Sequence, residues 1–266
     1  MSLRAFVAVL QALGLFVGLF LIIQSRRIKS KSDMIFILLA AITLIIWMLP
    51  RHKLFDISIS IFLIGILTYL ILNPVSKRYF LTGVCVGLIA FFGRNHGVYG
   101  AIGSLGVIAW LSIQNQSNIS FIKAISLWGG GVVIGFSPII MMSIFIPGFG
   151  IAFWESVRFL FEIKATNLSL PTPWPWNVNF SNALFGAATR GVLIGLFFLG
   201  TLLFAGLSLA WVIYRRFRNE VTPPALVASA FLAIPYAHYA FSRAGIGHLA
   251  QGVFPMLVGV FVLLFV

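Results

Sequence analysis

Two short stretches combine arginine, histidine and glycine within an otherwise apolar sequence. "GRNHG" contains Arg94 and His96, and "SRAGIGH" contains Arg243 and His248. A guanidinium group can bind a phosphate through two parallel hydrogen bonds, and an imidazole can assist it or bind a metal. The repetition predicts that these four side chains enter one cavity and bind one phosphate group. In the alternative interpretation, the arginines only reach toward lipid headgroups and the glycines only permit close packing.

The chain has only five acidic residues, so few groups can accept a proton. Asp56 is the only acid in "PRHKLFD", and Glu155 lies in the mixed apolar and charged run "FWESVRFLFE". A carboxylate can act as a general base toward an incoming hydroxyl group. Asp56 and Glu155 are therefore the candidate catalytic bases, although a helical pair with Arg158 would make Glu155 merely structural.

The connection over residues 147–190 combines two patterns that are typical of a membrane interface. Its first part predicts an amphipathic helix, because apolar residues recur at helical intervals: Phe153, Val157, Leu160 and Phe161. The next stretch, "LPTPWPWN", has three prolines, which favour an extended course and block a helix. Trp174 and Trp176 are candidates for a lid that binds the acceptor, and the other interpretation is an aromatic belt at headgroup depth.

No motif of a common soluble enzyme is present. The sequence has no phosphate-binding P-loop, no HExxH, no CxxC and no GxSxG. A divalent cation is compatible with phosphate chemistry, but no ligand motif supports one, so the metal requirement stays open. The single Cys85 cannot form an internal disulfide.

The composition predicts an all-α, polytopic integral membrane protein. Of 266 residues, 61% are hydrophobic and only 9% are charged, which is too few charges for a soluble domain. The net charge of +13 would suggest nucleic acid as the partner of a soluble chain. Here the excess of Lys and Arg is better explained by cytoplasmic connections between membrane spans, and we expect no nucleic acid partner.

Nine apolar segments predict about nine transmembrane helices in a single domain over residues 1–266. The first six spans fall within 1–146, the outer connection occupies 147–190, and the last three spans fall within 191–266. Several segments are shorter than the roughly 20 residues that cross the hydrocarbon. They are Ala5–Ile23, Met34–Leu49, Ile57–Leu72, Phe80–Phe92, Val98–Ile113, Ala124–Ile146, Gly191–Tyr214, Ala225–Phe241 and Leu249–Val266. The run "WGGGVVIGFSP" within them predicts close helix packing and a kink at Pro138.

The basic residues predict the orientation. "QSRRIKSKSD" follows the first segment and carries four of them, whereas only Arg4 precedes it. The positive-inside rule then places the N-terminus outside and the C-terminus in the cytoplasm, in a bacterial inner membrane or a plasma membrane. With this topology all four histidines, His52, His96, His238 and His248, lie toward the outer side.

The order of these features resembles the C-type membrane glycosyltransferases that use polyprenyl-phosphate sugars. The resemblance covers residues 56–255 and is carried by "YFLTGVCVGLIAFFGRNHGVY" and "YAFSRAGIGHLAQGVFP". It implies that Arg94, His96, Arg243 and His248 bind the donor phosphate, and that an Asp of an outer loop deprotonates the acceptor hydroxyl. The expected partners are membrane lipid and a polyprenyl-phosphate sugar.

Two features depart from the family pattern. Position 245 is Gly where the family has an acid, and Asp56 is the only acid of the first outer loop after a complete span. Together with the outside N-terminus, they indicate the C-terminal portion of such an enzyme, without its catalytic base. Two other hypotheses stay open: a transporter or flippase of an anionic lipid-linked substrate, and a non-catalytic membrane subunit whose arginines contact protein.

Overall fold

The protein is all-helical. The computed structural model describes residues 3–25, 28–48, 56–113, 119–162, 170–180 and 185–265, of which 86% are helical and none is in a strand. The helices are α1 (Leu3–Gln24), α2 (Lys31–Trp47), α3 (Asp56–Leu72), α4 (Ser76–Phe92), α5 (Arg94–Ser112), α6 (Phe121–Gly135), α7 (Ser137–Phe145), α8 (Phe149–Glu162), the 3-10 turn η2 (Pro175–Asn177), α9 (Phe185–Phe217), α10 (Pro224–Ser242), α11 (Ile246–Gly252) and α12 (Phe254–Phe265). This confirms the predicted all-α class.

Each predicted apolar segment falls on a helix or on a bent pair of helices, but nine spans are not confirmed. Within the described ranges, three helices are long and apolar enough to cross a membrane: Arg4–Gln24, Phe185–Phe217 and Pro224–Ser242. Two bent pairs raise the number to five if each is one span: α6 with α7, bent by 48°, and α11 with α12, bent by 51°. Helices this apolar are compatible with an integral membrane protein.

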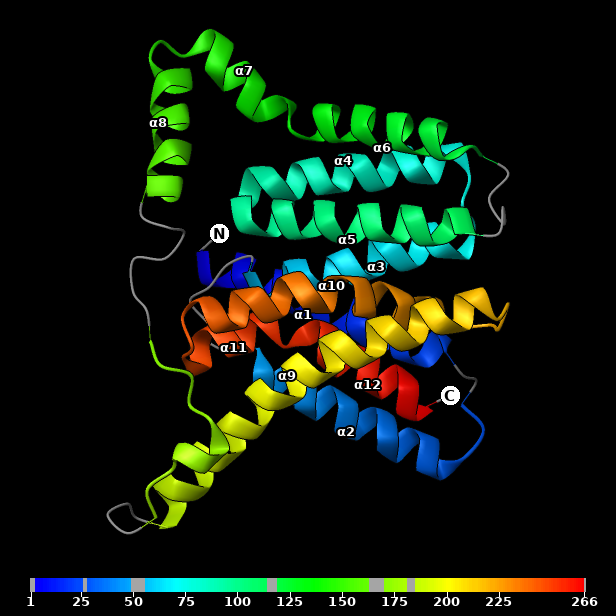
Figure 1. The fold of residues 1–266 in the computed structure, drawn as a ribbon, viewed down its shortest axis with the longest axis vertical. Helices are drawn as coiled ribbons and strands as arrows, with labels where there is room; N and C mark the ends of the chain where they lie inside the picture. The colour runs from blue at the N-terminus through cyan, green and yellow to red at the C-terminus, as the bar shows by residue number, and fades with distance from the viewer. Residues whose placement is uncertain are drawn as a thin grey trace.

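Helix α10 forms the centre of the bundle. It packs against α3, α5, α9, α11 and α12, and most of its side chains are buried. Many of them are alanines, including Ala228, Ala230 and Ala233. Small side chains let neighbouring helices approach closely, so one helix can contact several others. Figure 1 shows α10 between α5 and α9, with α3, α4, α5 and α6 stacked on one side of it.

Glycines join α4 to α6 along a matched stripe. A Cβ atom at Gly83 would overlap the carbonyl oxygen of Trp128, and one at Gly131 would overlap that of Phe80. Gly87 and Gly135 repeat this contact one turn along each helix. The predicted close packing of "WGGGVVIGFSP" is thereby confirmed, and the chain bends between α6 and α7, next to Pro138 at the start of α7.

The connection over residues 147–190 departs from the body of the molecule. Its helix α8 is present as predicted and stands crosswise at one end of the bundle (Figure 1). Phe153 contacts Phe136, whereas Phe161 is 80% exposed. The three prolines do not exclude helical structure completely, because Pro175 begins the short 3-10 turn η2. The first position of a helical turn needs no N–H donor, so proline is tolerated there.

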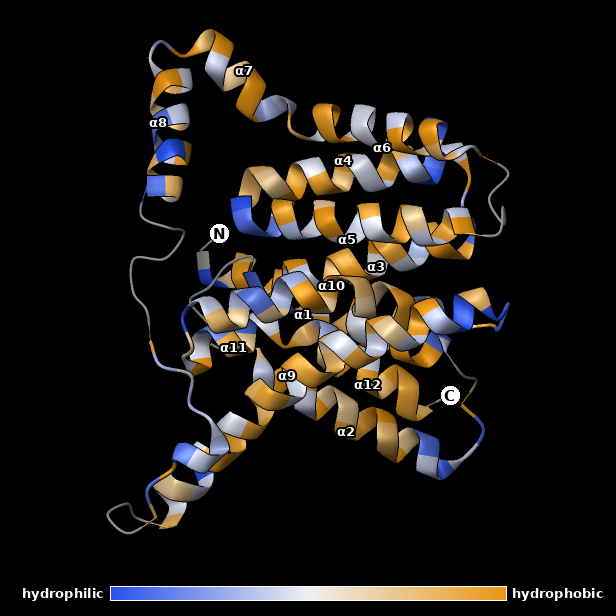
Figure 2. Cartoon of the chain, viewed as in Figure 1, coloured by the Kyte–Doolittle hydropathy of each residue, from blue (hydrophilic) through white to orange (hydrophobic). Residues whose placement is uncertain are grey.

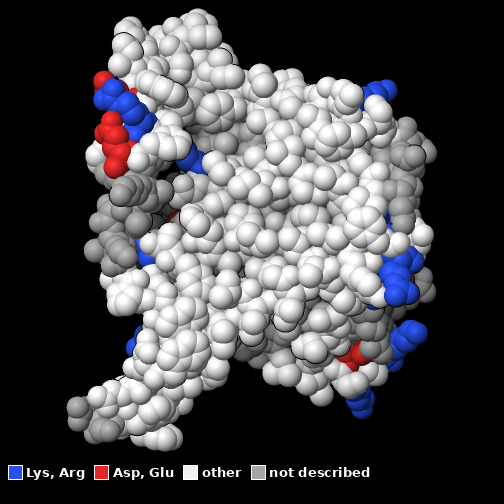
Figure 3. All heavy atoms as spheres, viewed as in Figure 1, with Lys and Arg blue, Asp and Glu red and all other residues white. Residues whose placement is uncertain are grey.

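Charge is confined to two opposite edges of the visible face. Figure 2 shows hydrophobic residues along the whole length of the packed helices. Figure 3 shows Lys, Arg, Asp and Glu at the edge of α8 and at the opposite edge, with uncharged surface between them. This distribution suits a chain whose middle faces lipid and whose two ends face water.

Candidate functional site

A polar cluster lies where four helices meet at one end of the bundle. Asp56 begins α3, and His96 lies in the first turn of α5. Tyr236 and Tyr239 lie in the last two turns of α10, and His248 lies in α11. Residues from three distant parts of the chain therefore share one site.

His96 connects the cluster through both of its ring nitrogens. Its Nε2 lies 3.1 Å from Oδ1 of Asp56, and its Nδ1 lies 2.8 Å from the hydroxyl oxygen of Tyr236. The imidazole is 2% exposed, whereas the Asp56 side chain is 24% exposed. With the proton on Nε2, His96 donates to the carboxylate and Nδ1 accepts from Tyr236. The buried ring is thus fully hydrogen-bonded and holds a carboxylate that reaches the surface.

Glycines let His96 turn into the core. Only Gly93 separates the end of α4 from the start of α5, and its extended backbone (φ −157°) reverses the chain. A Cβ atom on Gly93 would come within 3.0 Å of the His96 ring, and one on Gly97 would overlap Ala90 of α4. The glycines of "GRNHG" therefore position the imidazole by allowing the two helices to touch.

Tyr239 links the two histidine segments that the sequence predicts to act together. Its ring lies 5.4 Å from the ring of His96 and 5.4 Å from that of His248, measured between centroids. Its hydroxyl donates to Oε1 of the buried Gln251 at 2.8 Å. His96 and His248 thus flank one tyrosine.

Arg94 has a different partner from the one expected. It is exposed, and its Nη1 donates to Oγ of Ser156 in α8 at 3.1 Å. This bond joins the start of α5 to α8, the helix that stands crosswise at the end of the bundle where the polar cluster lies. Arg94 therefore connects α8 to the start of the helix that carries His96.

Glu155 lies on α8 with an exposed side chain. In the described part of that helix, Arg158 pairs with Glu162 instead, with 3.1 Å between Nε and Oε1. Residues three and four apart both face each other on a helix, and here the pair that forms is the one four apart. Of the two candidate bases, only Asp56 is held by a buried partner.

The tryptophans of "LPTPWPWN" lie beside the same end of α10. Trp174 stacks on Trp176 with 5.2 Å between ring centroids, and it lies 5.9 Å from Phe241, two residues before Arg243. The segment rests on α9, where a Cβ atom on Gly195 would come within 2.6 Å of the Pro173 carbonyl oxygen. Trp176 stays 67% exposed. The pair therefore covers the flank of the cluster.

Comparisons with protein-family models, with curated proteins and with solved structures find no match. The function is therefore inferred from the geometry of this site.

Sequence reasoning missed the tyrosines. Tyr99, Tyr236 and Tyr239 form the walls around His96, and Tyr99 bonds through its hydroxyl to Nδ1 of the exposed His238 at 3.2 Å. The sequence signal that could have identified them was the spacing of Tyr236 and Tyr239, three residues apart on one face of an apolar helix.

His52 lies outside the described residues. Within the described residues, no three His, Cys, Asp or Glu side chains gather to hold a metal.

Proposed function

We propose that the chain is a membrane glycosyltransferase-like protein. It transfers a sugar from a polyprenyl-phosphate donor to an acceptor hydroxyl group at the outer face of the membrane in which it lies. The observation that supports this most is the chain of hydrogen bonds from Asp56 through His96 to Tyr236, on the helix that ends at Arg243 and with His248 beside Tyr239. It combines a surface carboxylate with the groups that bind a phosphate.

In this mechanism Asp56 is the general base. It accepts the proton of the acceptor hydroxyl, whose oxygen attacks the anomeric carbon of the sugar. The bond between that carbon and the phosphate oxygen breaks, and the electron pair leaves with the polyprenyl phosphate, which inverts the anomeric configuration. His96 is a positioning residue, because it holds one carboxylate oxygen of Asp56 in place.

Arg243 and His248 bind the phosphate that accumulates charge as the bond breaks. A guanidinium group can do so with two parallel hydrogen bonds. Trp174 and Trp176 are the candidate acceptor-binding lid, since aromatic faces suit the apolar faces of sugars. The proposal also includes nine membrane spans, an N-terminus on the outer side, and a location in a bacterial inner membrane or a plasma membrane.

The test is sugar transfer by the reconstituted protein. Purified chain in lipid nanodiscs is supplied with radiolabelled polyprenyl-phosphate sugars and a panel of hydroxyl acceptors, and polyprenyl phosphate release is measured. We expect Asp56→Asn to lower the rate by about 10²–10⁴-fold, the usual contribution of a general base. Glu155→Gln, a matched carboxylate change on α8, should leave the rate unchanged.

Binding separates the donor site from catalysis. Arg243→Gln should weaken binding of polyprenyl phosphate, whereas Asp56→Asn should retain it. If the wild-type chain neither binds polyprenyl phosphate nor releases it from any donor, the proposed function is wrong. Movement of a labelled lipid between leaflets without sugar transfer would instead indicate a transporter or flippase.

One contact favours a second candidate, a non-catalytic membrane subunit. That hypothesis predicts that the arginines contact protein, and Arg94 does contact Ser156. Under it, Arg94→Gln would release a protein partner during purification without altering polyprenyl-phosphate binding. The pair of the buried His96 with Asp56 favours the transferase, because it holds a partly exposed carboxylate in one position.

A further inference from the structure

A cavity lies at the opposite end of the bundle from Asp56. It has a volume of about 290 Å³ and is enclosed by the C-terminal ends of α3, α5 and α9 and by the start of α10. None of the residues that the sequence predicts to bind a ligand lines it. Arg216 and Thr222 are its most informative polar residues.

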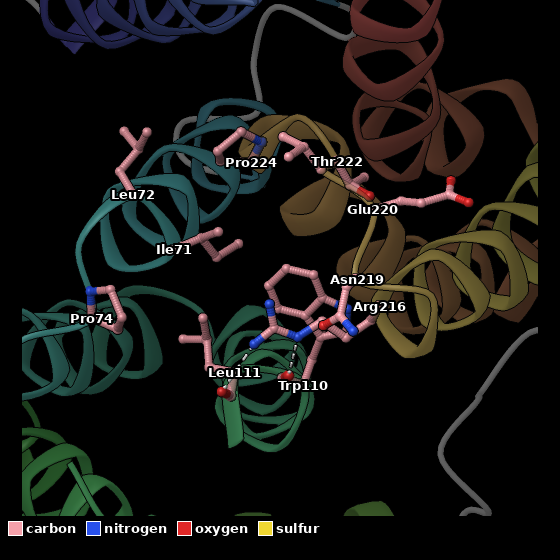
Figure 4. Close-up of a pocket in the computed structure, with 11 residues that line it drawn as sticks. Ile71, Leu72, Pro74, Trp110, Leu111, Arg216, Asn219, Glu220, Thr222 and Pro224 are labelled. Carbon is pink, nitrogen blue, oxygen red and sulfur yellow. Dashed lines mark hydrogen bonds between the residues drawn. The ribbon is translucent and has the colours of Figure 1, made fainter. Parts of the chain in front are cut away.

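Arg216 places a positive charge inside this cavity. Its side chain is buried, and Nε and Nη2 donate to the carbonyl oxygens of Trp110 and Leu111, each at 3.1 Å. Its guanidinium carbon also lies 4.2 Å from the Trp110 ring centroid. These contacts with the last turn of α5 hold the cation rigidly at one wall, as Figure 4 shows.

The opposite wall offers a hydroxyl group. Thr222 and Pro224 lie there (Figure 4). Thr222 is 7% exposed, and its Oγ1 has no hydrogen-bond partner in the described part of the chain. Pro224 has no N–H group, and the amides of Leu226 and Val227 donate to the Pro223 carbonyl oxygen at 3.0 and 3.1 Å, so the Thr222 hydroxyl is the main polar group of this wall. A buried cation and an unpaired hydroxyl thus line one partly open cavity.

The acid in this cavity does not cancel its positive character. Glu220 lines it, but Oε2 of Glu220 forms an ion pair with Nε of Arg215 at 3.0 Å. Arg215 also stacks over Trp211, and Arg218 stacks over Tyr214. The end of α9, beside the cavity, is therefore rich in arginine and aromatic rings, which is typical of a surface at headgroup depth.

We propose that this cavity binds the phosphate group of an anionic phospholipid from the leaflet at this end of the molecule. Its volume is at the lower limit for ligand pockets and accommodates a headgroup rather than a whole lipid. Basic pockets between membrane helices bind phosphate headgroups in this way.

The experiment measures binding of short-chain lipids to the purified chain in detergent by native mass spectrometry. The probes are dioctanoyl phosphatidic acid, dioctanoyl phosphatidylcholine and inorganic phosphate. We expect phosphatidic acid to bind at least about tenfold more tightly than either of the others, because only it combines a full phosphate charge with acyl chains. Thr222→Val, which removes one hydroxyl group, should weaken its binding at least about fivefold.

Thr43→Val is the matched control, since Thr43 is exposed on α2 and its hydroxyl bonds to the Leu39 carbonyl oxygen. It should bind phosphatidic acid like the wild type. Arg216→Lys, checked for folding by thermal unfolding, should also weaken binding. Equal binding by wild type and Thr222→Val overturns the site. Equal binding of phosphatidic acid and inorganic phosphate overturns the assignment to a lipid headgroup.

Discussion

At the scale of single residues, His96 shows how a polar group is retained in an apolar core. Both of its ring nitrogens have partners, from α3 and from α10. A buried polar group that loses its partner costs about 1–3 kcal/mol, so the three side chains are energetically coupled. The coupling also fixes the Asp56 carboxylate in one orientation, which a general base requires.

Removing the Tyr236 hydroxyl should reveal this coupling. Tyr236→Phe leaves Nδ1 of His96 buried without its donor, and we expect the free energy of unfolding to fall by about 1–3 kcal/mol. Thermal unfolding in detergent measures the loss. Tyr214→Phe, which changes an exposed tyrosine, should have no effect. Equal stability of both variants would contradict the hydrogen-bond chain.

At the scale of elements, the glycine stripe determines how α4 meets α6. Four glycines, Gly83, Gly87, Gly131 and Gly135, occupy positions where a Cβ atom would overlap the backbone of the facing helix. The two helices gain dispersion contacts that larger side chains would prevent. This packing supports the α4 end from which Gly93 turns the chain into the site.

Two neighbouring glycines of α6 provide a matched test. Gly131→Ala places a methyl group against the Phe80 carbonyl oxygen, and we expect it to destabilise the fold by about 1–3 kcal/mol. Gly130→Ala meets nothing within 4 Å, and its higher helix propensity should stabilise the fold by up to about 1 kcal/mol. Thermal unfolding of both variants in detergent compares them, and the opposite order would contradict the packing.

The docking of the tryptophan segment on α9 can be tested in the same way. Gly195→Ala would bring a methyl group within 2.5 Å of the Pro175 nitrogen, so the segment should detach and be cleaved faster in limited proteolysis. Gly206→Ala on the same helix meets open space and should leave cleavage unchanged. Unaltered cleavage in both variants would show that residues 170–180 do not depend on this contact.

At the scale of the whole molecule, the two ends of the bundle have different chemistry. One end holds the histidine and tyrosine cluster together with Asp56, and the other holds the cavity with Arg216 and the neighbouring Arg215 at the end of α9. The uncharged surface between them (Figure 3) faces lipid in the proposed arrangement. Opposite ends should then be accessible from opposite sides of the membrane.

Labelling with a membrane-impermeant thiol reagent tests this arrangement. In a Cys85→Ala background, Asn95→Cys and Ile246→Cys should label from one side, because both exposed positions lie at the cluster end. Lys123→Cys, at the start of α6 at the other end (Figure 1), should label only from the opposite side. Labelling of Asn95→Cys and Ile246→Cys from different sides would exclude a shared site.

The sequence alone determined the helical class, the position of each helix along the chain and the close glycine packing. These features depend on local composition and on the helical repeat, which neighbouring residues carry. The sequence also singled out Arg94, His96, Arg243 and His248 as one phosphate-binding set and Asp56 and Glu155 as candidate bases. It could not separate nine spans from fewer, because several apolar segments are shorter than the roughly 20 residues that cross the hydrocarbon.

Only the tertiary structure decided which polar groups meet. His96 finds Asp56 40 residues away and Tyr236 140 residues away, whereas Arg94, two positions earlier, bonds to α8 instead. Arg216 looks like one more basic residue of a cytoplasmic connection, yet it lies buried against the end of α5. Such pairings depend on the order and rotation of packed helices, which interhelical contacts set and no local pattern encodes.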